Sequence, residues 1–196
     1  MEPPDDPGNP SVDFHGEKRS NATHASTTDP EAKLARKSTT ASKMSYSAHA
    51  LMENRNGLII DFRVEEADGY AERRTAIEML YEHAVKDRCI TVGGDAGYDT
   101  NGFVADCRAI NVTPHIAQTR DTRRRSAIDE RTTRHAGYLV SQRKRKLVEE
   151  IFGWMKTIGG FRRTRFKGRR RTQLAATLVA ATYNMLRICR LLPSRA

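Results

Sequence analysis

One segment of the chain combines acidic and basic residues at a spacing that suits chemistry on phosphates. Arg145, Glu149 and Lys156 occur within twelve consecutive residues, 145–156. Each residue of an α-helix advances by about 100°, so these three side chains fall within about 40° of one another. A carboxylate between two cations suits a metal ligand that works beside phosphates. The plainer interpretation is an exposed helical face with ion pairs at i,i+4.

The same segment carries the apolar side chains that would attach such a helix to a core. The arc beside the charged stripe is filled by Leu147, Val148, Ile151, Phe152 and Met155. This pattern predicts a helix over residues 141–156 with Glu149 at the edge of its buried face. Glu150 is turned by about 100° from Glu149 and therefore points away from the charged stripe.

A second candidate acid follows a short β-branched run. Residues 89–94 predict a strand, and Asp95 to Asp99 read Asp-Ala-Gly-Tyr-Asp. A carboxylate just past a strand, with small neighbours, allows a metal and a phosphate to approach the backbone. Asp and Gly also build ordinary turns, so this motif alone has low specificity.

Taken together, these motifs resemble the DDE transposases of bacterial insertion sequences. The spacing Arg145, Glu149, Lys156 resembles their glutamate signature, and residues 95–99 resemble their second-acid element. Further similar strings, in the same order along the chain, are residues 14–21, 23–32, 43–46 and 49–58. The resemblance therefore extends from about residue 10 to the C-terminus.

The resemblance implies a fold, a cofactor and a partner. It implies an RNase H-like fold in which Asp95 and Glu149 are the second and third catalytic acids. Both would be ligands of a two-metal site for Mg²⁺ or Mn²⁺ that catalyses DNA cleavage and strand transfer. Arg145 and Lys156 would contact phosphates of the DNA. Gln142 stands where related proteins often have a tyrosine, so no role is assigned to it.

The first acid of the family has no counterpart at its usual place. In the family it lies on an opening strand, in an Asp-Gly-Thr-Leu-like string upstream of residues that match 14–17 here. Asp13, Asp29 and Asp61 are acids elsewhere in the chain, and none matches that string. The expectation is a truncated copy that holds the C-terminal part of a transposase and is inactive alone. The alternative is a non-catalytic, basic DNA-binding remnant or regulator of a full-length element.

The charge balance also favours a polyanionic partner. Of the 196 residues, 34 are Lys or Arg and 24 are Asp or Glu, a formal net charge of +10. Two basic clusters would flank the Glu149 helix and bind DNA backbone, although charge runs are often merely solvated. They contain Arg123, Arg124 and Arg125 before the helix and Arg162, Arg163, Arg165, Arg169, Arg170 and Arg171 after it.

Nothing in the sequence points to a membrane or an oxidising compartment. No apolar run reaches the roughly 20 residues that span a bilayer, and the N-terminus does not resemble a signal peptide. Three widely spaced cysteines form no metal or disulfide framework. A cytoplasmic, nucleoid-associated protein is expected. A homo-oligomer is compatible with the family, but the sequence gives neither its size nor its interface.

The order of the expected elements indicates an α/β fold. The expectation is an RNase H-like mixed sheet flanked by helices, incomplete because its opening strand is missing. Residues 1–45 are expected to form an extended or partly disordered arm, and 46–196 the C-terminal part of the catalytic domain. Strands are expected at 46–50, 58–64, 89–94 and 112–116, and helices at 71–86, 100–109, 141–156 and 172–192.

Overall fold

The strands form two separate sheets. The computed structural model describes residues 20–23, 25–36, 42–85, 87–120 and 123–192. An antiparallel sheet has the order β1-β2-β3, and a parallel pair is formed by β4 and β5. The strands are β1 (Lys33–Ala35), β2 (Lys43–Met52), β3 (Ile59–Glu66), β4 (Ile90–Gly94) and β5 (Val112–Ile116). The α/β class is confirmed, but the expected single mixed sheet is divided in two among the described residues.

The predicted β-hairpin is present as β2 and β3. Their register pairs Tyr46 with Glu66 and Ala50 with Phe62, and it shifts between Leu51 and Met52. Glu53 closes the turn because its Oε1 accepts the N–H groups of residues 56 and 58, at 2.7 and 3.2 Å. Residues 33–35, within the expected N-terminal arm, form β1 and pair with the beginning of β2.

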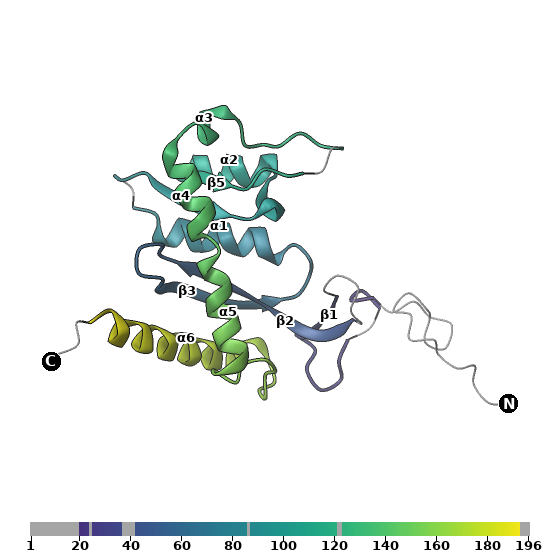
Figure 1. Ribbon diagram of the computed structural model, residues 1–196. Helices are drawn as coiled ribbons and strands as arrows, with labels where there is room; N and C mark the ends of the chain where they lie inside the picture. Colours follow the sequence, from purple (N-terminus) through teal and green to yellow (C-terminus); the bar gives the residue numbers. More distant parts are fainter. Residues whose placement is uncertain (1–19, 24, 37–41, 86, 121–122, 193–196) are drawn as a thin grey trace.

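Six α-helices connect and cover the strands in the described part of the chain. They are α1 (Ala71–His83), α2 (Asn101–Ala109), α3 (Glu130–Thr133), α4 (Ala136–Lys144), α5 (Leu147–Thr157) and α6 (Arg169–Leu191). In Figure 1, α4 and α5 form a column that runs from the β4–β5 pair to the β2–β3 hairpin. No described helix is long and apolar enough to cross a membrane.

The apolar side chains gather in two clusters, one for each sheet. The first lies between the hairpin and α5 and α6, and its buried members include Phe62, Val64, Ile151 and Met155. The second lies among α1, α2, β4, β5 and the beginning of α4, around Phe103. The column therefore joins both clusters, with α4 packed in the second and α5 in the first. The predicted apolar arc of α5 is confirmed by this packing.

Helix α6 also protects the outer edge of β3. The amide of Gln173 accepts the N–H of Val64 at 2.6 Å and donates to the carbonyl of Phe62 at 2.8 Å. The amide of Asn184 likewise accepts the N–H of Ile59 and donates to the carbonyl of Ile59, both at 2.8 Å. The two amides lie about three helical turns apart on one line of α6. They satisfy strand groups that would otherwise form an open pairing edge.

Candidate active site

The helix that carries Glu149 is interrupted four residues earlier. A continuous helix was expected over 141–156, but α4 ends at Lys144 and α5 begins at Leu147. Across this turn, the N–H of Val148 donates to the carbonyl of Arg145 at 3.3 Å and the N–H of Glu149 to that of Lys146 at 3.0 Å, both i to i−3 bonds. Such winding advances each residue by about 120° rather than 100°, so the ideal-helix angle between Arg145 and Glu149 does not hold across this turn. The break occurs where the column passes from one apolar cluster to the other.

The carboxylate of Glu149 is exposed and makes no hydrogen bond or ion pair with any described residue. The Arg145 guanidinium instead donates from Nε to Oε1 of Gln142 at 3.0 Å. Gln142 in turn donates to the carbonyl of His115 at 2.7 Å. The ammonium of Lys156 lies 6.0 Å from the centre of the Phe152 ring. The i,i+4 ion pair of the plainer interpretation is therefore not formed, and Glu149 is left available to a ligand.

Asp95 stands at the end of β4, as the sequence predicts. Its Oδ1 accepts the N–H of Gly97 at 2.8 Å and so caps the 3-10 turn Ala96–Tyr98. The side chain is exposed. A cap of this kind fixes the carboxylate through one oxygen, and the second oxygen remains free to bind a cation.

Two glycines at the end of β4 make room for their neighbours, Gly93 for the helix column and Gly94 for the Ile116 side chain of β5. A Cβ at Gly93 would lie 3.3 Å from Cβ of Arg145 and 3.3 Å from the carbonyl oxygen of Ser141. A Cβ at Gly94 would lie 2.7 Å from Cδ1 of Ile116. Asp95 follows Gly93 by two residues, and Glu149 follows Arg145 by about one helical turn. The contact therefore places the turn between α4 and α5 beside the end of β4.

The second acid of the Asp-Ala-Gly-Tyr-Asp motif has a structural role that the sequence did not reveal. Asp99 is buried, and its two oxygens accept the N–H groups of Thr119 at 2.7 Å and Ala127 at 2.8 Å. It thereby fixes both ends of the basic segment 119–127. Within the same motif, burial and the nearby Glu72 carboxylate raise the pKa of the Tyr98 hydroxyl. One motif thus holds an exposed acid and a buried one.

Two of the other candidate acids, Asp61 and Asp29, are engaged elsewhere. Asp61 forms an ion pair with Arg63 at 2.8 Å, and its Oδ2 lies 3.3 Å from Nε2 of His83. Asp29 accepts the Tyr46 hydroxyl at 2.8 Å, and burial together with this contact raises the pKa of Tyr46. Asp13 lies outside the described residues. Within the described ranges, no three His, Cys, Asp or Glu side chains gather closely enough to hold a metal ion.

The two basic clusters lie at opposite ends of the α4–α5 column (Figure 1). Their arginines are all exposed, namely Arg123, Arg124, Arg125, Arg162, Arg163, Arg165, Arg169, Arg170 and Arg171. Arg169 differs, because its guanidinium contacts the Glu65 carboxylate at 3.0 Å. Its backbone N–H also donates to Glu31 at 2.8 Å. Arg169 therefore ties the beginning of α6 to the sheet, which complicates its predicted contact with DNA.

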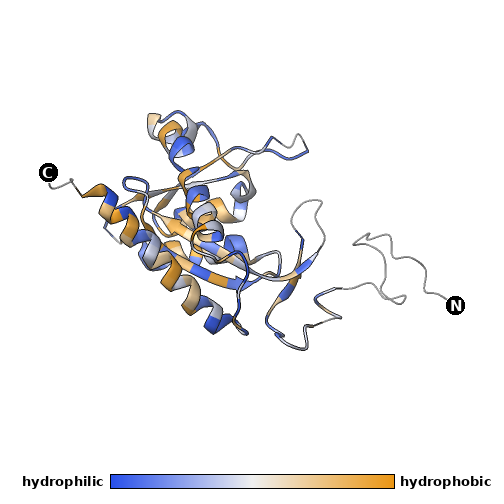
Figure 2. Ribbon diagram, turned by 60° about the horizontal axis from the view of Figure 1, so that its bottom comes forward, coloured by the Kyte–Doolittle hydropathy of each residue, from blue (hydrophilic) through white to orange (hydrophobic). Residues whose placement is uncertain are grey.

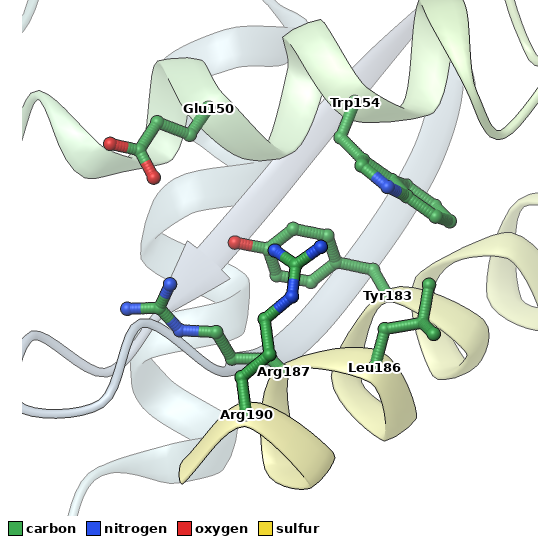
Figure 3. A pocket seen from close by; sticks show the side chains of 6 residues that line it. All are labelled: Glu150, Trp154, Tyr183, Leu186, Arg187 and Arg190. Carbon is green, nitrogen blue, oxygen red and sulfur yellow. The ribbon is translucent and has the colours of Figure 1, made fainter.

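Glu150 belongs to a different surface from Glu149. It lines a hollow of about 130 Å³ between α5 and α6, together with Trp154, Tyr183, Leu186, Arg187 and Arg190. Figure 3 shows the Glu150 side chain on α5 opposite the two arginines of α6. The rings of Trp154 and Tyr183 meet edge to face, with centroids 5.5 Å apart. The adjacent glutamates therefore have separate surroundings.

Comparison with known families identifies the chain. Its sequence matches the profile of the transposase DDE domain over residues 17–185, which is most of its length. The chain belongs to the transposase DDE domain family. This confirms the resemblance drawn from residues 95–99 and from the spacing that ends at Lys156. No curated protein and no solved structure matches this transposase DDE domain.

Proposed function

We propose that this transposase DDE domain takes part in DNA transposition by metal-dependent phosphoryl transfer, with Asp95 and Glu149 as two of the catalytic acids. The observation that carries the proposal is the glycine-mediated contact between the end of β4 and Arg145. It places the turn that leads into the Glu149 helix beside the strand that leads to Asp95, which supports the pairing of these two acids. Both carboxylates are exposed, and Glu149 is without a partner among the described residues. Family membership supports the reaction class.

The side chains of Asp95 and Glu149 offer carboxylate oxygens, the ligand type that a hard divalent cation prefers. Mg²⁺ and Mn²⁺ prefer carboxylate oxygens, and Asp95 and Glu149 would hold such an ion. The ion would supply charge stabilisation at the reacting phosphate. Asp95 is oriented by its bond to Gly97. Glu149 is oriented by a helix whose Ile151 is fully buried.

A third carboxylate would come from outside the described residues. Two-metal sites need several negative ligands because two divalent ions lie only about 3.5–4 Å apart. Asp29 and Asp61 are held by Tyr46 and Arg63, which makes them poor candidates. We therefore expect the RNase H-like site of this domain to be completed by a further segment.

The experiment that tests the function is a cleavage assay with Mg²⁺ or Mn²⁺ on DNA that carries the ends of the element. The purified chain is compared with a version extended at its N-terminus by its own upstream coding sequence. We expect cleavage by the extended version and none by the short chain. Cleavage by the short chain that is lost in Asp95→Ala would place the third acid within residues 1–196. No cleavage by either version would contradict the proposed activity.

The basic clusters are proposed to bind the DNA backbone. Each neutralised phosphate steepens the fall of log affinity with log salt concentration by about 0.9 on duplex DNA. Replacing Arg170 and Arg171 by alanine should therefore flatten that slope by about 1–2. Arg169→Ala is the matched comparison, since Arg169 is held by Glu65 and should mainly affect stability. An unchanged slope in the double variant would show that the cluster is only solvated.

A further inference from the structure

The guanidinium of Arg145 is held by a relay of hydrogen bonds that begins at the backbone of β5. The amide of Gln142 donates from Nε2 to the carbonyl of His115 at 2.7 Å. The same amide accepts at Oε1 the Nε–H of Arg145 at 3.0 Å. Both bonds are partly shielded from water. The side chain of Gln142 therefore connects Arg145 to the strand through both ends of one amide group.

The end of α4 that carries this relay is itself fixed to the parallel pair of strands. A buried hydrogen bond of 2.8 Å joins Nδ1 of His115 to the hydroxyl of Ser141. The carbonyl of Ser141 accepts the backbone N–H of Arg145 at 2.9 Å. On the side of β4, a Cβ at Gly93 would lie only 3.3 Å from Cβ of Arg145. The stem of Arg145 therefore has a defined position relative to both strands.

The two terminal amino groups of Arg145 are left for a ligand. They make no hydrogen bond or ion pair with any residue that the structure describes. A guanidinium held at Nε can still present both terminal groups to one phosphate as a fork. Arg170 and Arg171, at the hydrophilic beginning of α6 in Figure 2, have no such support from a described residue. Arg145 thus differs from them because its direction is set in advance.

We propose that Gln142 is a positioning residue, which directs the terminal amino groups of Arg145 toward one phosphate of bound DNA. The inference rests on the proposed function, because it takes DNA as the ligand. A long side chain loses rotamer freedom when it binds a phosphate, and an arginine that is already held loses less. Gln142 therefore raises the affinity for DNA without touching the DNA itself.

An amide suits this role because it can donate and accept at the same time. A methionine at position 142 has a similar length but offers no N–H to the carbonyl of His115 and only a weak acceptor to Arg145. An asparagine keeps the amide but is one methylene shorter, so it cannot reach both partners. Gln142→Met and Gln142→Asn therefore remove the same relay, one with an apolar and one with a polar side chain.

A double-mutant cycle on the affinity of the purified chain for a short DNA duplex tests the coupling, with each variant titrated at several salt concentrations. Arg145→Ala should lower the affinity about tenfold and flatten the slope of log affinity against log salt concentration by about 0.9. Gln142→Met should lower the affinity about three- to tenfold with an unchanged slope, because the charge stays and only its direction is lost. In the Arg145→Ala background, Gln142→Met should have no further effect. Gln142→Asn should behave like Gln142→Met.

Ser141→Ala is the matched control. It removes a neighbouring side-chain bond between α4 and His115 but leaves the relay to Arg145, so the folded variant should bind DNA like the wild type. Unfolding in urea shows which variants are folded. Equal losses on Gln142→Met in both backgrounds, the same loss in Ser141→Ala, or an unchanged slope in Arg145→Ala would overturn the proposal. The cleavage assay tests the proposed function separately, so the failure of one does not resemble the failure of the other.

Discussion

Replacing Glu149 with glutamine is expected to lower metal-dependent DNA cleavage by the N-terminally extended version at least about 10³-fold. The change removes a negative metal ligand while keeping the size of the side chain. Metal-ion stabilisation of the transition state contributes several kcal/mol, and each 1.36 kcal/mol corresponds to a factor of ten in rate. Folding should be unaffected, because the Glu149 side chain is exposed and contacts no described partner.

Glu150→Gln is the matched control for this loss. It makes the same chemical change one residue further along α5, in a side chain that lines the hollow beside Trp154. Activity should stay close to that of the wild type. Equal loss of activity in both variants would mean that the negative charge of α5 in general is required. It would contradict the assignment of Glu149 as a metal ligand.

The second large effect is expected from Asp99. Asp99→Ala should destabilise the fold by roughly 2–6 kcal/mol, because two partly buried N–H groups lose their acceptor at about 1–3 kcal/mol each. These groups belong to Thr119 and Ala127. The segment between them carries Arg123, Arg124 and Arg125, so its binding to DNA should weaken as well. The free energy of unfolding, measured with urea, gives the size of the effect.

Asp95→Ala provides the contrast from within the same motif. Its carboxylate is exposed and caps a single N–H, so the expected loss of stability is at most about 1 kcal/mol. Activity of the extended version should nevertheless disappear. If Asp95→Ala were the more destabilising change, the division of this motif into a site acid and a structural acid would be wrong.

The sequence pattern predicted those strands and helices whose formation depends mainly on the order of apolar and polar residues along the element itself. The strand predicted at residues 58–64 is β3, and the apolar arc from Leu147 to Met155 predicted the buried face of α5. The strand Val112–Ile116 was predicted with the bounds that the structure has. In each case side-chain periodicity coincides with the face that is buried.

The features that the sequence could not reveal depend on distant contacts. The break at Arg145 and Lys146 arises because α4 and α5 pack in different clusters, while the helical pattern continues through both residues. Gly93 and Gly94 end the predicted strand as small neighbours of Asp95, and the pattern does not show that they make room for Arg145 and Ile116. Asp99 looked like part of a turn because its partners lie 20 and 28 residues away.

The central claim is that Asp95 and Glu149 hold one divalent metal site. The most direct measurement is an experimental structure of the chain at saturating Mn²⁺, with the metal located by its anomalous scattering. We predict a peak within about 2.0–2.6 Å of a carboxylate oxygen from each residue, the range of metal–oxygen bonds. The two carboxylates must then lie close together, since two-metal sites hold their ions only about 3.5–4 Å apart. Carboxylates more than about 10 Å apart, or manganese bound elsewhere, would contradict the claim.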